Sequence, residues 1–516
     1  MKRIGALLLC AAVLLSLLSG CDANSQKPYV PTGDGLSWEG DYTGPEATQP
    51  QEDSQVLTLI YYPDRSMNPI TCTEYTNRAL FSLIYQSLFA VDRNYHAEPQ
   101  LCYRYFMSED MKSYTFYIME KATFSDGTRL TPEDVAASLQ AASSSRYYSG
   151  RFQHITSIAV TADGGVTVQV STPMENLPLL LDIPIIKQTE LTADFPLGTG
   201  PYAPEQTVSG LRLRRVSNWW CRADMIVTAP SIALKTATSI TQIRDAFEFE
   251  DLDLVCADPG SDRYADYRCD YELWDSENGI FLYLVCNTDS KVFSNGTVRA
   301  ALTHAVDRDA VVQKYYRGFA RSATLPASPL SPYYSQTLAA QYGYDSGKFV
   351  QAVSDAQLRE QKVVLLVNSD DSLRLRVARD IGEMIAGCGL VVEMKELGGS
   401  EYQYALQTRD YDLYVGQTKL SPNMDLTAFF KSKGSLSFGG IEDLSMYALC
   451  LDALANHGNY YTLHKKVMDT GMLCPVLFRS YAVYATRGVL TGLSPSRDNV
   501  FYYSLGRTMS DALIEE

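Results

Sequence analysis

The sequence predicts an α/β fold, and three observations support this prediction. Segments typical of buried β-strands alternate with segments whose apolar residues recur at helical spacing. Residues 363–394 read as a strand, a helix and a second strand with short connections, which favours a parallel sheet. Hydrophobic residues make up 46% of the 516 positions and charged residues 20%, so the chain has enough apolar material for sizeable cores.

The first elements follow this alternation. We predict a strand over residues 56–62 and a helix over residues 79–88, where mostly apolar side chains recur at helical spacing. A second strand is predicted over residues 114–118, before a tight turn at Asp126-Gly127. A helix then begins at Thr131, because a proline and two acids follow this hydroxyl residue, as at a capped N-terminus. We interpret the segments FSDGT and TPEDV as structural rather than catalytic.

The later elements continue the pattern. Strands are expected over four segments, residues 211–216, 226–235, 281–288 and 363–368. Residues 281–288 form an almost continuous apolar run, which is typical of a strand buried on both faces. Helices are expected over residues 297–316 and 372–386, and a further strand over residues 390–394.

The first 54 residues predict export and attachment to a membrane. A positively charged start precedes an apolar run of about 15 residues, too short to span a bilayer comfortably, so residues 1–20 are interpreted as a signal peptide. The run ends in LSGC, which resembles a bacterial lipobox and implies cleavage before Cys21 and lipidation of its thiol. A plain secretory signal with a chance cysteine is the alternative. Residues 22–54 are rich in Pro, Gly, Asp, Thr and Ser, so residues 21–54 form the lipidated cysteine and a flexible tether.

The charge balance excludes one class of partner. The chain carries 44 Lys and Arg against 60 Asp and Glu, a formal charge of −16, so it repels phosphate backbones and we expect no nucleic-acid partner. Of its 11 cysteines, nine follow Cys21, and this odd number excludes a complete disulfide framework. Several of them lie in apolar runs, where a thiol behaves as a small buried hydrophobe.

Several segments together resemble the family 5 extracellular solute-binding proteins, the oligopeptide, dipeptide and nickel receptors of ABC importers. The most specific matches are FSDGT with TPEDV, within residues 113–139, and VRAAL with AVDRDA, within residues 298–320. Further matches, in the family's order, are Asn68-Pro69, residues 83–89, residues 198–202 and Trp219-Trp220. The resemblance extends over about residues 55–507.

This resemblance implies a two-lobed periplasmic-binding-protein type II fold with hinge-crossing strands and an enlarged first lobe. Lobe I would comprise residues 55–278 and a returning segment, residues 475–516. Lobe II would comprise residues 279–474. The apolar run at residues 281–288 precedes a change in the pattern of helices and strands, as a crossing strand should.

The function that the resemblance implies is capture of a solute without chemistry, so we expect no enzyme. A peptide or similar polar solute would bind between the lobes, and a membrane permease would recognise the closed form. A separate ATPase would supply the energy, because the chain has no G-x-x-x-x-G-K-[ST] motif. The implied location is the outer face of the bacterial cytoplasmic membrane, with the protein held there by its lipid. We expect a monomer without cofactor or metal.

Ligand-binding residues are expected in two segments that match the family. The first contributes Met67, Asn68 and Tyr75, which lie in or near a loop that approaches the cleft in the family. These residues could equally be ordinary turn residues. The second segment contributes Gln417, Thr418, Lys419, Asn423 and Asp425.

The second segment departs from the family's peptide receptors. In those receptors a loop Asp, just before a second Asp, pairs with the peptide's α-amino group. When Asp425 is aligned with the second Asp, Pro422 occupies the place of the amine-binding carboxylate and Gln417 lies near the place of a Trp. A buried ammonium without a counter-charge is costly, so we do not expect a free amine to be the recognised group. Lys419 favours a carboxylate or another anionic ligand if it points inward; the alternative is that it faces solvent.

Two other functions stay open. A lipid-anchored extracellular sensor would bind such a solute without transporting it, and an extracellular hydrolase would use one of the free cysteines. The sequence contains no G-x-S-x-G, H-E-x-x-H or Rossmann glycine motif. His457 and His464 are the one near pair of histidines, and no Cys or acid completes a zinc set around them, so we expect no metal site there.

Overall fold

The computed structural model describes residues 56–505, except residues 209, 222–224 and 262–263. The predicted signal peptide, the lipidation site Cys21 and the tether lie outside the described residues. Among the helices of this described part, none combines the length and the apolar character that are needed to cross a bilayer.

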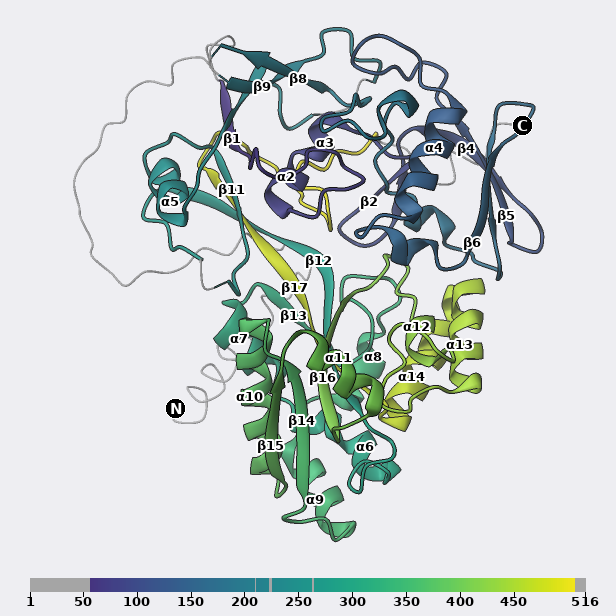
Figure 1. Cartoon of the computed structure of the whole chain (residues 1–516), viewed down its shortest axis with the longest axis vertical. Helices are drawn as coiled ribbons and strands as arrows, with labels where there is room; N and C mark the ends of the chain where they lie inside the picture. The colour runs from purple at the N-terminus through teal and green to yellow at the C-terminus, as the bar shows by residue number, and fades with distance from the viewer. Residues whose placement is uncertain (1–55, 209, 222–224, 262–263, 506–516) are drawn as a thin grey trace, which may run out of the picture. The chain divides into compact units, whose positions relative to one another are not determined.

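A mixed sheet of 11 strands runs through the described residues (Figure 1). The strand order is β15 (Val391–Leu397), β14 (Lys362–Asn368), β16 (Leu413–Lys419), β12 (Tyr271–Cys286), β17 (Leu473–Thr486), β11 (Leu254–Ala257), β1 (Leu57–Ile60), β10 (Ser231–Lys235), β9 (Gly210–Arg215) and β8 (Tyr202–Thr207). The short strand β13 (Ala320–Ser322) pairs with β17 beside this path. Parallel pairs occur on both sides of β12 and β17, which themselves pair antiparallel with each other. The predicted α/β class is therefore confirmed.

β12 and β17 connect the two sides of this sheet. They have 16 and 14 residues and lie side by side in the middle of the strand order (Figure 1). β17 pairs with β11 near its C-terminal end, whereas the second half of β12 pairs with β16. A register shift between Glu277 and Phe281 separates the two halves of β12. The predicted strand at residues 281–288 is this second half, and its side chains are buried up to Cys286.

The strand, helix and strand predicted within residues 363–394 are confirmed. β14 and β15 are parallel neighbours, with Lys362 opposite Val391, and α10 (Ser372–Gly387) connects them. α10 buries Val377, Ile381 and Ile385 in an apolar cluster that also holds residues of β12, β14 and β16. The helix predicted over residues 372–386 is thus confirmed, and the helical spacing of its apolar residues accounts for its buried face.

The predicted helix start at Thr131 is also confirmed. α4 (Pro132–Ser143) begins with a capping box, in which the Thr131 hydroxyl accepts a hydrogen bond from Asp134 N (3.2 Å) and the Asp134 carboxylate accepts one from Thr131 N (2.9 Å). Just upstream, Gly127 adopts a φ of +85° in the Asp-Gly turn, a conformation that glycine reaches without strain. Turn and cap chemistry thus accounts for the segments FSDGT and TPEDV.

The helix predicted over residues 297–316 is interrupted. The structure has α6 (Gly296–Ala301), a 3-10 turn and α7 (Arg308–Tyr316). The main chain is extended at Val306 and Asp307, and the Asp307 carboxylate caps α7. The buried Arg308 guanidinium donates to the carbonyl oxygens of Thr303 (2.9 Å) and Val306 (3.2 Å). These bonds stabilise the chain in the conformation that interrupts the helix between Ala305 and Arg308.

Two further predictions differ from the structure in extent. Instead of one helix over residues 79–88, the structure has α2 (Tyr75–Ala79) and α3 (Phe81–Ile84). The Ile84 carbonyl accepts a hydrogen bond from Gly200 N (2.8 Å), so the chain pairs with another segment where the helix was expected to continue. The strand predicted over residues 226–235 begins only at Ser231, because Pro230 has no N–H to donate to a neighbouring strand.

The remaining elements are short sheets, helices and turns. A two-stranded sheet pairs β2 (Phe89–Val91) with β3 (Ala97–Pro99), and a four-stranded sheet has the order β4 (Cys102–Met107), β5 (Ser113–Ile118), β7 (Val166–Val170) and β6 (Ile155–Val160). The further α-helices are α5 (Ile240–Glu248), α8 (Gln336–Ala339), α9 (Ser346–Asp355), α11 (Gly399–Thr408), α12 (Thr427–Phe430), α13 (Leu444–Ala455) and α14 (Tyr460–Thr470). The 3-10 turns are Ser149–Phe152, Leu177–Leu180, Gln188–Glu190, Leu302–Ala305, Ala340–Tyr342 and His457–Asn459.

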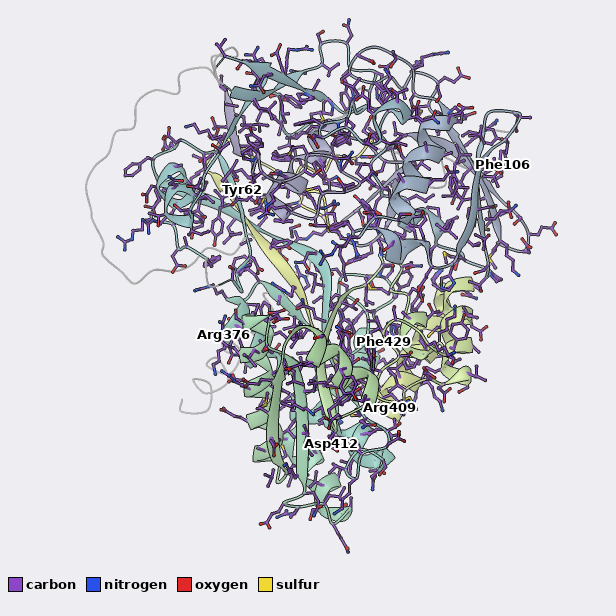
Figure 2. All side chains as sticks on the ribbon, in the orientation of Figure 1. Tyr62, Phe106, Arg376, Arg409, Asp412 and Phe429 are labelled. Carbon is purple, nitrogen blue, oxygen red and sulfur yellow. The ribbon has the colours of Figure 1, made fainter. Side chains whose placement is uncertain are left out.

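Gly416 provides a test of how tightly β16 packs on β12. It lies opposite Tyr283, and a Cβ atom at this position would lie 2.3 Å from Tyr283 Cε2. Tyr283 is held on its other side by an edge-on contact with Phe429, which is labelled in Figure 2, at 5.0 Å between ring centroids. We therefore expect Gly416→Ala to lower the free energy of unfolding by about 1–3 kcal/mol, measured by urea denaturation of the purified protein.

Gly387→Ala is the matched control for this substitution. A Cβ atom at Gly387, the last residue of α10, would meet nothing within 4 Å. Because alanine restricts the unfolded chain more than glycine does, we expect this control to keep the stability of the wild type or to raise it by up to about 1 kcal/mol. Equal stability of the two variants would contradict the tight packing of β16 on β12.

Candidate functional site

Three of the predicted ligand-binding residues lie at the C-terminal end of β16. Gln417, Thr418 and Lys419 pair with residues 280–282 of β12, next to the register shift in that strand. The side chains of all three are half-buried, whereas the preceding residues of β16 are buried. The end of β16 therefore brings polar side chains to the place where β12 passes from one side of the sheet to the other.

A buried arginine on β17 connects this strand end with the far side of the sheet. Arg479 is 8% exposed, and it donates hydrogen bonds to Asp258 Oδ2 (2.6 Å) and Gln417 Oε1 (3.3 Å). Asp258 follows β11, so the guanidinium bridges segments on the two sides of the crossing strands. Our sequence reasoning missed Arg479 and Asp258. A lone arginine within the apolar run LCPVLFRSYAVYAT is the signal that could have found them, because a buried charge needs a partner.

Tyr75, another predicted binding residue, stacks on Tyr481 of β17. The ring centroids are 3.6 Å apart, and the planes are inclined by 22°. Tyr481 follows Arg479 by two residues, so the two side chains lie on the same face of the strand. Both rings are half-buried, and burial raises the pKa of Tyr75 well above its ordinary value. The stack is thus a neutral aromatic surface on the face of β17 that carries Arg479.

Lys419 points into the protein and forms an ion pair. Its Nζ lies 2.5 Å from Asp498 Oδ1 and donates a hydrogen bond to the Tyr147 hydroxyl (2.6 Å). The side chain is 25% exposed. Burial, together with the charges of Arg497 and Arg78, lowers the pKa of Lys419 to about 7, although Asp498 acts in the opposite direction. Burial is therefore the main reason that Lys419 is a weaker base in the folded protein than an ordinary lysine.

Asp498 is the centre of a larger charged group. Besides Lys419, it faces Arg151 Nη2 at 3.4 Å and Arg497 Nε at 3.8 Å. Arg151 also forms an ion pair with Asp182. Although burial opposes ionisation, the neighbouring cations lower the pKa of Asp498 far below its ordinary value, Lys419 most of all. We call this group the Asp498 cluster, and its members are Arg78, Tyr147, Arg151, Asp182, Lys419, Arg497 and Asp498.

The two other predicted residues of this segment are buried in the loop after β16. Asp425 accepts a hydrogen bond from Thr427 N (2.8 Å), and its other oxygen lies 3.0 Å from His154 Nε2. His154 lowers the pKa of Asp425, against the effect of burial. Asn423 is 1% exposed, and its side-chain amide has no hydrogen-bond partner among the described residues. The loop thus holds one carboxylate, Asp425, which already has partners.

Met67 and Asn68 are buried, and the bonds of the Asn68 side chain go to residues outside β16. The Asn68 amide donates to the carbonyl oxygens of Leu191 (3.0 Å) and Ala193 (2.9 Å), and its carbonyl oxygen accepts from Ile70 N (3.0 Å). These bonds connect two loops and use the donors and the acceptor of this side chain. A role of Met67 or Asn68 in ligand binding stays a prediction.

Within the described chain, the cysteines are free thiols and the two neighbouring histidines lie in different surroundings. The nine cysteines of the described chain are free, and burial raises the pKa of Cys72 and that of Cys256, the latter to about 12. His464 is fully buried, which lowers its pKa to about 3, whereas His457 is exposed and pairs with Glu175 (2.7 Å). In the part of the chain that the structure describes, no group of three or more His, Cys, Asp or Glu side chains is arranged to hold a metal ion.

Comparison with known proteins gives one family. The profile of the family described as "Bacterial extracellular solute-binding proteins, family 5 Middle" matches residues 96–437. The glutathione-binding protein GsiB of Escherichia coli is 23% identical over 317 residues, which cover 55% of this chain and 60% of GsiB. The chain thus aligns with about 60% of the length of this curated relative.

Solved structures show the same fold. The putative peptide binding protein AppA from Clostridium difficile superposes with a TM-score of 0.71 at 15% identity, over 87% of this chain and 98% of AppA. The nickel ABC transporter protein from Bacillus halodurans gives a TM-score of 0.70 at 18% identity, over the same shares of the two chains. At these identities the likeness concerns the fold, a mixed α/β fold that matches two-lobed periplasmic-binding-protein structures. The fold expected from the resemblance is confirmed.

The low pKa of Lys419 predicts a pH-dependent stability. In the unfolded chain a lysine keeps its proton up to a pKa of about 10.4. Folded Lys419 loses its proton above about pH 7, so between these values the unfolded state binds more protons. The contribution of Lys419 to the free energy of unfolding therefore rises with pH, by up to about 1.4 kcal/mol per pH unit. We expect the wild type to gain stability relative to Lys419→Met between about pH 7 and about pH 9 in urea denaturation.

Nuclear magnetic resonance of ¹⁵N-lysine-labelled protein checks the titration directly. Lys419→Arg removes one signal and so assigns it, while it keeps a positive charge at this position. A Lys419 signal that titrates with ordinary lysines, near about pH 10, would contradict the low pKa.

Proposed function

Because the chain belongs to the bacterial extracellular solute-binding proteins of family 5, we propose that it is the receptor of an ABC importer. It captures a peptide or another polar solute of similar size between two lobes and delivers it to a membrane permease, which works with a separate ATPase. Lobe I comprises residues 55–278 and 475–516, and lobe II comprises residues 279–474. The protein acts outside the cytoplasm, anchored by a lipid on Cys21.

The observation that carries this proposal is the group of polar side chains where β12 and β17 cross the sheet. Arg479 and Gln417 offer donors and acceptors for the polar groups of a solute, and the stack of Tyr75 on Tyr481 adds a flat aromatic surface. These residues come from segments on both sides of the crossing strands. A solute that contacts both sides favours the closed arrangement through its differential contacts.

The properties of the thiols support capture without chemistry. A cysteine hydrolase needs a thiolate, which requires a lowered thiol pKa. Burial instead raises the pKa of Cys72, Cys256 and Cys474. The names of the compared proteins refer to binding or transport of glutathione, peptides and nickel. We therefore propose a binding protein without catalytic activity.

The charges of the site support a solute that is not held by its amine. Asp425, the carboxylate in the loop after β16, bonds to Thr427 and His154. Asp498 faces four cations and is paired with Lys419. A ligand ammonium would thus have to displace an existing partner of either carboxylate, at a cost in free energy.

We expect N-acetylated peptides to stabilise the protein as well as peptides with a free amine do. A thermal-shift screen of the purified protein against peptide, saccharide and metal-chelate libraries first identifies a solute that binds. At 100 times its Kd, a ligand adds about 2.7 kcal/mol of stability. Each peptide that binds is then measured beside its N-acetylated form. A strict need for the free amine would show that a carboxylate for the amine exists elsewhere in the site.

The same solute tests the transport function. Deletion of this chain from its cell should abolish uptake of the stabilising solute at concentrations near its Kd. Uptake that continues unchanged would argue for a sensor, which binds the solute without importing it.

We also expect Cys21→Ser to release the protein from the membrane fraction. Without the thiol no lipid can be attached, and the acyl chains, at about 0.8 kcal/mol per buried CH₂, no longer hold the protein at the surface. The distribution of the protein between membrane and soluble fractions is measured by immunoblot. Cys10→Ser is the matched control, because Cys10 lies within the apolar run and outside LSGC. If both variants behave like the wild type, Cys21 is not the anchor.

A further inference from the structure

A small polar cavity lies beside the Asp498 cluster. It has a volume of about 60 Å³ and is bounded by α2, α3, β2 and the segment around Asp498. A cavity volume of about 10–15 Å³ on this measure is enough for one water molecule, so the space admits a carboxylate group together with water. Its charged and amide-bearing lining residues are Arg78, Gln86, Gln100, Asp182, Arg497, Asp498 and Asn499.

In the Asp498 cluster the cations outnumber the carboxylates. Below about pH 7, where Lys419 keeps its proton, the cluster contains four cations, Arg78, Arg151, Lys419 and Arg497, but two carboxylates, Asp182 and Asp498. Lys419 pairs with Asp498, and Arg151 pairs with Asp182. Arg78 and Arg497 have no carboxylate within hydrogen-bonding distance among the described residues; the nearest recorded approach is 3.8 Å, from Arg497 Nε to Asp498. These two arginines line the cavity together with Asp182 and Asp498, whereas Lys419 and Arg151 do not.

The two remaining arginines are buried and have unused donors. Arg497 is 4% exposed, and its Nε and Nη1 have no hydrogen-bond partner among the described residues. Its Nη2 donates to the Leu420 carbonyl. Arg78 is 5% exposed, and its Nε likewise has no partner there. Because a buried donor without an acceptor is costly, and more so when it is charged, the two arginines favour an acceptor that carries negative charge.

A further acid near Arg497 does not supply this acceptor. Glu277 is close enough to interact electrostatically with Arg497. Its oxygens, however, accept hydrogen bonds from Tyr95 and from Ser328 (2.9 Å), and Arg321 lies 3.7 Å away. Glu277 is also not part of the cavity wall. Glu277 thus does not satisfy the unpartnered donors of Arg78 and Arg497, the two arginines that line the cavity.

We propose that this cavity is a subsite for one carboxylate group or a monoanion of similar size, held by Arg78 and Arg497. Two sources of this chemistry exist. One is a carboxylate of the captured solute, which rests on the proposed function. The other is a free monoanion such as acetate, which does not depend on that function. In both cases the anion accepts hydrogen bonds from guanidinium nitrogens that have no hydrogen-bond partner among residues 56–505 as the structure describes them.

Acetate is the first probe, and sulfate at equal ionic strength is its control. Acetate should raise the melting temperature of the purified protein along a saturating curve, whereas sulfate, a larger dianion, should give the small unsaturated effect of a salt. Arg497→Met should lower the apparent affinity for acetate at least tenfold. Arg379→Met is the matched control, because Arg379 is an exposed arginine paired with Glu396, and it should leave the acetate curve unchanged.

A second variant tests the cavity without removal of a charge. Ala90 lines the cavity and is buried in β2, so Ala90→Val fills part of the space while all four cations stay in place. It should also weaken acetate binding at least tenfold. If neither variant folds, the wild type alone tests the subsite. A saturating effect of acetate without one of sulfate supports the subsite, and equal effects of the two salts contradict it.

The second probe is a set of tripeptides with a free C-terminal carboxylate, each compared with its C-terminal amide. If the solute is the source of the anion, the carboxylate forms should bind at least tenfold more tightly, and Arg497→Met should remove this difference. The proposal would be overturned if acetate had equal effects on the wild type and the variants. It would also be overturned if acetate had no effect and the carboxylate and amide forms of the peptides bound equally well. If no peptide binds at all, the proposed peptide ligand fails, while the acetate measurement still decides the subsite.

Discussion

The antiparallel pairing of β12 with β17 is the constraint on which the rest of the described structure depends. In the main sheet, β11 and the strands beyond it are joined to β14, β15 and β16 through these two strands. Most residues of both strands are buried or half-buried, so a charged side chain on them must find its partners within the protein. Arg479 does so by bonding to Asp258 and Gln417, which belong to the two sides. A polar meeting point of both sides is therefore a direct consequence of the strand pairing.

In the Asp498 cluster, too, buried charged side chains find their partners within the protein. These partners come from segments that are remote in sequence. The bonds of Asp498 to Lys419, Tyr147 and Arg151 join residues 79, 351 and 347 positions apart. Arg78 is held differently, by carbonyl oxygens and by the ring of Tyr147, whose centroid lies 3.4 Å from the guanidinium carbon. Neutral acceptors and an aromatic face compensate a buried cation less fully than a carboxylate does. The cluster is thus ordered, but its charge is not balanced by the described side chains.

The sequence predicts those parts of the structure whose partners are close along the chain. Thr131 and Asp134 cap α4 across three residues, and α10 follows from its own apolar spacing. The break before α7 was not predictable in this way, because Arg308 holds it open through contacts that include the carbonyl of Pro475, 167 residues away. The same limit applies to the site: the resemblance located Gln417 and Lys419 in their segment, but no local pattern connects Lys419 with Asp498.

The sign of the charge at the site differs from that of the whole chain. The formal charge of the protein is −16, which by itself disfavours an anionic ligand. Exposed charges are screened beyond about 8 Å at physiological ionic strength, however, whereas buried charges are screened much less. An anion near Arg78 and Arg497 would therefore respond mainly to the local cluster, in which cations outnumber carboxylates. The loop after β16 offers a ligand ammonium no free carboxylate, because its carboxylate Asp425 is already engaged by His154. Buried local charge, rather than net charge, is thus the basis of the proposed anion subsite.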